Sequence, residues 1–193
     1  MSLNFTKNQT LILGILFNHP EKSYYLREIG RLVGKEPGVF QKDINKLVES
    51  GILTSEYRAK SRFFALNKLH PLYKEYKSIF FKTIGAEGQL KLILKNIENI
   101  KVAFIYGSFA TGKEDAFSDI DLMIIGNPDE DVLIRKISLL ERKIDREINY
   151  NIFSPTDIRN NLLNNEIFLK EIMERPKAFI IGDQNELEEI IGK

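Results

Sequence analysis

The sequence predicts an α+β protein of two domains, and three observations lead to that prediction. Apolar residues recur at helical spacing through residues 11–48, and two short apolar runs follow at 52–55 and 62–66. Further along, the apolar runs 102–106 and 120–125 read as buried strands, and alternating helix and strand patterns continue after them. Residues 1–85 hold 14 Lys and Arg against 7 Asp and Glu (net +7), whereas residues 86–193 hold 14 against 20 (net −6). We therefore expect a basic, mainly helical first part and an acidic α/β second part with a mixed sheet.

Three helices are expected in the first part. The first covers residues 11–17, the second runs from about Leu26 to Val33, and the third begins near Pro37 and ends at Gly51. The short turn at Gly34 between the second and third helices makes the pair a helix-turn-helix. The two apolar runs that follow are expected to form strands joined by a basic loop, with Arg58 and Lys60 in the loop and Arg62 at its end.

Residues 5–68 as a whole resemble a winged-helix domain of the small-repressor type, and the run 47–53 resembles the junction of recognition helix and wing in that family. The resemblance implies binding to double-stranded DNA, with the third helix in the major groove and the wing on phosphates. A solvated helix face and a protein-binding module are the alternatives. The expected DNA-binding residues are Gln41, Lys42, Asn45 and Lys46 on the third helix and Arg58, Lys60 and Arg62 in the wing.

The second part carries a Gly-Ser pair and two carboxylates beside its first two strands. Asp119 and Asp121 lie at the start of the second strand, and period-two alternation places both on one face. Two hard oxygen donors on one face suit Mg²⁺ or Mn²⁺. Gly107 allows a phosphate to approach the backbone, and Ser108 adds a hydroxyl at the expected start of a helix. The residues predict a nucleotide and its metal at one place.

These residues resemble the signature of the DNA polymerase β-like nucleotidyltransferases in their minimal form, a Gly-Ser pair after a strand followed by Asp-x-Asp on the next. The fuller minimal pattern is also met by Ala110, Gly112, Ser118 and Leu122. The resemblance implies catalysis by Asp119 and Asp121 with a nucleoside triphosphate as substrate or ligand. Thr111 stands where minimal transferases often carry a basic residue, and Lys113 is expected to compensate.

The family completes its metal site with a third carboxylate on a neighbouring strand. Here the expected strand is 147–153, and its best-placed position holds Asn149, with Glu147 as a substitute if the register differs. An amide oxygen can ligate a cation but adds no charge, so binding of a metal–nucleotide is better supported than transfer.

The expected domains are 1–70, a helical linker at 71–99, and 100–193. This order resembles a prokaryotic group of winged-helix regulators fused to a minimal nucleotidyltransferase domain, in which Asn commonly stands at the third position. The linker carries an apolar stripe that is expected to pack the domains together or to form a homodimer interface. The stripe consists of Leu72, Tyr73, Tyr76, Ile79, Phe80 and Ile84.

Composition removes several classes of protein. The chain has no Cys, which excludes a disulfide framework, thiol catalysis and a Cys-based zinc site. No apolar run approaches the ~18 residues of a membrane span, so we expect a cytoplasmic protein. Three functions remain open. The first is a DNA-binding transcriptional regulator that senses a nucleotide. The second is an active transferase, antitoxin-like or modifying, that moves a nucleotidyl group to a hydroxyl of protein, RNA or a small molecule, and the third is an inactive scaffold, such as an antitoxin-like module, that binds DNA or a protein.

Overall fold

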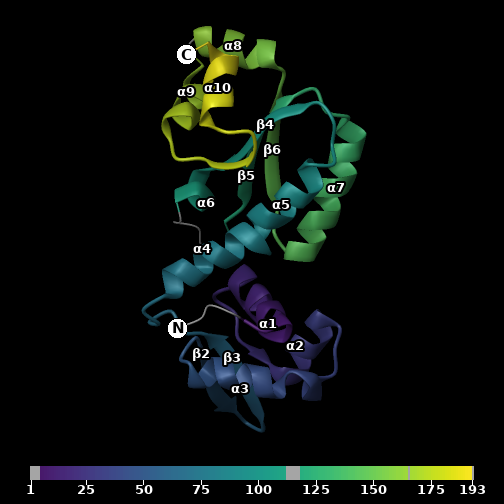
Figure 1. Ribbon diagram of the computed structural model, residues 1–193, viewed down its shortest axis with the longest axis vertical. Helices are drawn as coiled ribbons and strands as arrows, with labels where there is room; N and C mark the ends of the chain where they lie inside the picture. Colours follow the sequence, from purple (N-terminus) through teal and green to yellow (C-terminus); the bar gives the residue numbers. More distant parts are fainter. Residues whose placement is uncertain (1–4, 112–117, 165, 193) are drawn as a thin grey trace. The chain divides into compact units, whose positions relative to one another are not determined.

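The computed structural model describes residues 5–111, 118–164 and 166–192. The chain forms two compact units, Met1–Gly85 and Ala86–Lys193 (Figure 1). Helix α4 (Tyr73–Thr83) belongs to the first unit and α5 (Ala86–Leu94) to the second, so the residues expected to form a linker are divided between them.

The first unit consists of helices and a small antiparallel sheet. Thr6 caps α1 by accepting from the Gln9 amide, and the Gln9 side chain accepts from the Thr6 amide in return. Gly34 ends α2 with φ of 68°, a conformation that favours glycine. The strand order in the sheet is β1-β3-β2. The elements before α4 are α1 (Lys7–Asn18), β1 (Tyr24–Tyr25), α2 (Leu26–Val33), the 3₁₀ helix η1 (Pro37–Val39), α3 (Gln41–Glu49), β2 (Leu53–Arg58) and β3 (Ser61–Leu66).

Helix α4 completes the core of the first unit. Its Tyr76 and Phe80 are buried with residues of α1, α2, α3 and the sheet, and Phe17 of α1 stacks on Phe80 at a centroid distance of 5.0 Å. The buried residues of the predicted apolar stripe therefore pack in the core of this unit, while Leu72 and Ile79 stay exposed. Other core residues are Ile12, Leu13, Leu16, Ile29, Phe40, Ile44, Leu47, Leu53 and Phe64.

The hairpin differs from the expected one, because its strands are longer and its turn is tighter. Strands β2 and β3 pair from Leu53 opposite Leu66 to Arg58 opposite Ser61, which leaves only Ala59 and Lys60 between them. Ala59 has φ of 52° to make this turn. Arg58, predicted in the loop, is thus a strand residue.

The second unit is built on a four-stranded mixed sheet in the order β6-β5-β4-β7. Strands β5 and β6 are parallel, whereas β4 runs antiparallel to both β5 and β7. Side-chain caps start three of its helices, at Asp129, Ser154 and Asp183. After α5 come β4 (Ile100–Tyr106), α6 (Gly107–Thr111), β5 (Ile120–Gly126), α7 (Glu130–Ile144), β6 (Ile148–Phe153), α8 (Pro155–Leu163), α9 (Ile167–Glu174), β7 (Ala178–Ile181) and α10 (Gln184–Ile191).

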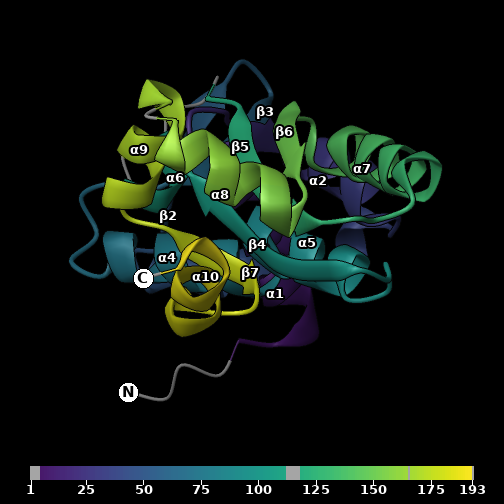
Figure 2. The same cartoon turned by 90° about the horizontal axis from the view of Figure 1, so that it is seen from above.

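Helices cover both faces of this sheet (Figures 1 and 2). On one face, Phe104 and Met123 pack against Ile158, Leu169 and Leu187 from α8, α9 and α10. The alternate strand residues are also fully buried and face α5 and α7, which contact each other. Both faces of the central strands are therefore apolar, and polar residues are confined to the strand ends. Among the described residues, no helix has the length and apolar character required to cross a bilayer.

Candidate functional site

Three strands bring polar side chains into one row at the end of the sheet. Tyr106 of β4 lies opposite Asp121 of β5, and Asp121 is the register partner of Asn149 on β6. Register partners point to the same face of a sheet, so the three side chains are neighbours. Asp119 directly precedes β5, and its Oδ2 accepts a hydrogen bond of 3.3 Å from Nδ2 of Asn149. The predicted carboxylates and the predicted amide thus meet at one corner.

Glu147 lies one step outside this row. Its backbone carbonyl accepts from the Ile120 amide at 3.0 Å, and its side chain is exposed. The parallel register therefore pairs Asp121 with Asn149 rather than with Glu147. No carboxylate occupies the third position of the row.

Gly107 turns the chain directly over Asp121. Its φ is +73°, and a Cβ at this position would lie 2.4 Å from Oδ2 of Asp121. Glycine adopts this conformation without strain and leaves the Asp121 carboxylate its space. Ser108 follows in the first turn of α6, where its carbonyl accepts from the Thr111 hydroxyl at 3.0 Å. Lys113, the predicted basic partner of the phosphates, lies outside the described residues.

The electrostatics of the corner favour a cation. Burial, followed by the nearby charge of Asp119, raises the pKa of the Asp121 carboxyl. Burial also raises the pKa of Tyr106, and the Asp121 charge adds to that effect, while the hydrogen bond from Asn151 opposes it. A divalent ion between Asp119 and Asp121 would offset both the burial of the Asp121 charge and its repulsion by Asp119.

The donor set fits Mg²⁺ in one particular form. Within the described residues there is no group of three His, Cys, Asp or Glu side chains that could hold a metal ion. Mg²⁺ is commonly held by one or two carboxylates, with substrate phosphates and water as the other ligands. Asp119 and Asp121 meet that requirement, and the Asn149 amide oxygen is a neutral third donor.

Arg146 supports this corner and was not foreseen from the sequence. Its Nη1 donates to the carbonyl of Ser118 at 2.9 Å, and its guanidinium lies 5.3 Å from the ring centroid of Phe109. It therefore connects the turn before β6 both to α6 and to the residue preceding Asp119. A single Arg between a helix and a strand carries no spacing signal, so only the fold reveals its role.

Residues 88–185 match the family described as polymerase beta, nucleotidyltransferase. The match covers half of the chain, and the protein belongs to this family.

Solved structures of toxin–antitoxin proteins are similar to part of the chain. A toxin–antitoxin crystallised with AMP-PNP has 17% identity over 55% of this chain and 81% of its own, at a TM-score of 0.38. Two mutants of the MntA–HpeT toxin–antitoxin have 14% and 17% identity over 55% and 53% of this chain and 81% and 76% of theirs, at TM-scores of 0.37 and 0.35. No match was found among curated protein sequences.

In the first unit, α3 and the hairpin enclose a polar surface. Five side chains of α3 line a hollow of about 440 Å³, and two of them also line an adjoining groove of about 520 Å³. The groove is completed by Lys60 and Arg62 from the hairpin, together with Arg27 and the exposed Tyr57. Four of the five α3 residues are the predicted Gln41, Lys42, Asn45 and Lys46, and the fifth is Glu49.

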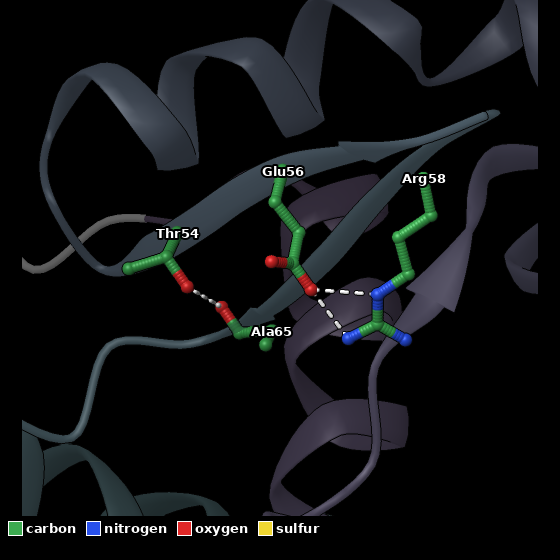
Figure 3. A network of polar contacts seen from close by, with 4 residues as sticks. All are labelled: Thr54, Glu56, Arg58 and Ala65. Carbon is green, nitrogen blue, oxygen red and sulfur yellow. Dashed lines mark hydrogen bonds and ion pairs between the residues drawn. The ribbon is translucent and has the colours of Figure 1, made fainter. Parts of the chain in front are cut away.

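Two of the predicted basic residues of the hairpin are held by partners within the unit. Nε of Arg58 donates to Glu56 at 2.7 Å on the same strand (Figure 3), and its guanidinium lies 4.8 Å from the Phe63 centroid. Arg62 donates to Asn45 at 2.9 Å and to the Ser55 hydroxyl at 2.9 and 3.0 Å. Arg58 lines neither hollow, whereas Arg62 joins the hairpin to α3.

Proposed function

We propose that this protein binds a metal–nucleoside triphosphate at the Gly107, Ser108, Asp119 and Asp121 corner and is a DNA-binding regulator that responds to that nucleotide. The observation that carries the nucleotide proposal is the meeting of two carboxylates with a backbone turn at positive φ that favours glycine. Membership of the nucleotidyltransferase family supports the same ligand.

Each residue has a distinct role in this proposal. Asp119 and Asp121 hold the Mg²⁺, which neutralises phosphate charge when bound. Gly107 leaves room for a phosphate beside the backbone, and the Ser108 hydroxyl and amide are hydrogen-bond donors to it. Asn149 contributes an oxygen without charge, so the site holds its cation less firmly than a three-carboxylate site would.

Equilibrium binding of radiolabelled ATP with and without Mg²⁺ tests the proposal. We expect metal-dependent binding that is lost in the Asp119→Ala/Asp121→Ala double variant. The Glu130→Ala/Asp131→Ala double variant removes the same charge from the exposed first turn of α7 and is the matched control. Equal binding by both double variants, or no binding by the unaltered protein, would overturn it.

Transfer of a nucleotidyl group is the second candidate, and family membership is the observation that favours it. In that reaction an acceptor hydroxyl attacks the α-phosphorus and pyrophosphate leaves. Incubation with α-labelled nucleoside triphosphates and cell lysate distinguishes transfer from sensing. Label on an acceptor that disappears in the Asp119→Ala/Asp121→Ala variant would make the protein an enzyme despite Asn149.

The DNA-binding part of the proposal is supported by the shared polar surface of α3 and the hairpin. Lys42, Lys46 and Lys60 are exposed on or beside it, in a unit with a net charge of +7 from 14 basic and 7 acidic residues. Such a surface suits a winged-helix domain on duplex DNA. There, each lost phosphate contact lowers the slope of log K against log salt concentration by about one.

We expect Lys42→Ala and Lys46→Ala to weaken binding to duplex DNA and to lower that salt slope. Lys74→Ala, at an exposed position of α4 outside both hollows, is the control. Addition of Mg-ATP should change the DNA affinity of the unaltered protein while the nucleotide stays intact. DNA affinity that is equal in all variants would exclude α3 as the DNA-binding element.

A further inference from the structure

Among the described residues of the second unit, one aromatic ring next to the carboxylate corner is exposed. Phe168 of α9 is 45% exposed, and its ring packs on the Tyr106 ring in a T-shaped contact with centroids 6.3 Å apart. Tyr106 is the residue opposite Asp121 and the residue before Gly107. Only the Tyr106 ring therefore separates Phe168 from the Gly107 turn and from Asp121 in the proposed function.

Three other described rings near the corner are almost fully buried. Phe104, Tyr106 and Phe109 are 0%, 8% and 8% exposed. The Tyr106 hydroxyl is further held by a hydrogen bond of 3.2 Å from Nδ2 of Asn151. Among the described residues of this unit, Phe168 is the only aromatic side chain in the set of exposed large apolar residues.

A ring that is 45% exposed keeps part of its face accessible to a ligand. Bases stack on aromatic side chains whatever their hydrogen-bonding pattern, because every base has a π face. A nucleoside triphosphate held by its phosphates at Gly107, Asp119 and Asp121 would bring its base to the border of the same corner.

We propose that Phe168, supported from behind by Tyr106, is the stacking platform for the nucleobase, and that the site favours purines because their larger π surface covers more of the ring. This inference rests on the proposed nucleotide binding and adds the contact that recognises the base. A site of this kind recognises a base by the area of its stacked surface, not by its pattern of hydrogen-bond donors and acceptors.

Two variants and one base-free ligand test the platform. Phe168→Ala should bind Mg-ATP about tenfold more weakly, as expected for loss of one stacked base, and should bind Mg-tripolyphosphate unchanged. Leu163→Ala, at a 74% exposed position at the end of α8, removes a comparable apolar surface and is the matched control. CTP should bind the unaltered protein more weakly than ATP.

A fluorescence measurement tests the platform without relying on the Phe168→Ala variant. The chain contains no Trp, so Phe168→Trp creates a single reporter at the platform. Its emission should be quenched by Mg-ATP and not by Mg-tripolyphosphate.

The outcomes separate the platform from the underlying site. If the unaltered protein binds neither ATP nor tripolyphosphate, the proposed function fails and the platform fails with it. If it binds both, but Phe168→Ala binds ATP normally and the Trp reporter does not respond, the nucleotide site stands and the platform is refuted. Phe168 would then belong to a surface for a protein partner, together with Leu163 and Ile167, which are each 74% exposed.

Discussion

Replacing Asn149 by Asp tests whether the third position of the row controls the metal site. Asn149 is the register partner of Asp121 and donates to Asp119 at 3.3 Å. Asn149→Asp removes that donor, which costs about 1 kcal/mol. It also adds a like charge to an exposed corner, where repulsion at about 4 Å costs about 1 kcal/mol more. The metal-free variant should therefore lose about 2 kcal/mol, or about 6 °C in melting temperature for a chain of this size.

The same change should strengthen metal binding. A third carboxylate at that distance attracts a divalent ion by about 2 kcal/mol in a water-like dielectric, which corresponds to about thirtyfold tighter binding. Because a ligand that binds only the folded state stabilises it, Mg²⁺ should raise the melting temperature of Asn149→Asp more than that of the unaltered protein. If nucleotidyl transfer is limited by the missing carboxylate, the variant should also transfer label faster.

Thermal melts with and without Mg²⁺ provide the assay, with Asn160→Asp as the control. Asn160 is exposed on α8, where the same amide-to-carboxylate change adds a charge away from the corner. If Asn149→Asp were as stable as the unaltered protein without metal and gained no more from Mg²⁺ than Asn160→Asp does, the carboxylates would not form a metal site with position 149.

Three further changes have defined outcomes. Gly107→Ala places a Cβ 2.4 Å from Oδ2 of Asp121 at positive φ, so strain of about 1–2 kcal/mol should appear in denaturant unfolding, together with loss of Mg-ATP binding. Arg146→Ala removes the hydrogen bond to the Ser118 carbonyl and should weaken Mg-ATP binding in equilibrium dialysis, whereas unchanged affinity would remove Arg146 from the support of the site. The hydrogen bond from Asn8 is the main cause that lowers the pKa of Asp43, so Asp43 stabilises the fold above its unfolded pKa. Asp43→Ala should cost about 1 kcal/mol in urea unfolding at neutral pH, and the difference should shrink as the pH falls through the lowered folded pKa.

Most of the secondary structure followed from local signals. Helix α2 was predicted with its observed bounds because its apolar residues recur at helical spacing and Gly34 ends it. Strands β4 and β5 were recognisable as short apolar runs next to Gly107 and Asp121, and they are buried on both faces. Where the spacing of apolar residues in a segment was clear, it was sufficient to predict the helix or strand.

Other boundaries depended on competition between neighbouring residues. The third helix was expected from Pro37, but Pro37–Val39 forms a 3₁₀ turn and α3 begins at Gln41. Phe40 has φ of −124° between them, because its side chain is buried in the core and Gly38 before it is a weak helix former. Strand β1 was missed because two residues carry no detectable period.

Contacts between distant segments could not be predicted from one sequence. Asn45 and Arg62 were both expected to contact DNA, yet they bind each other across 17 positions of the chain. The hydrogen bond between these two side chains fixes the position of the hairpin relative to α3. The chain pattern shows which residues are polar, but only the fold shows which of them are still available to a ligand.

Asn149 shows how a neutral side chain would make the nucleotide site responsive. Its Nδ2 donates to one Asp119 oxygen, so an N–H group occupies a position where a cation would otherwise bind. In the proposed function, metal binding replaces that hydrogen bond and the amide rotates to present its oxygen. The exchange costs about 1 kcal/mol for the lost bond, and cation coordination offsets that cost. A carboxylate at position 149 has no N–H donor to stabilise the metal-free state. It would bind the metal more firmly but would lose the hydrogen bond that Asn149 makes without metal.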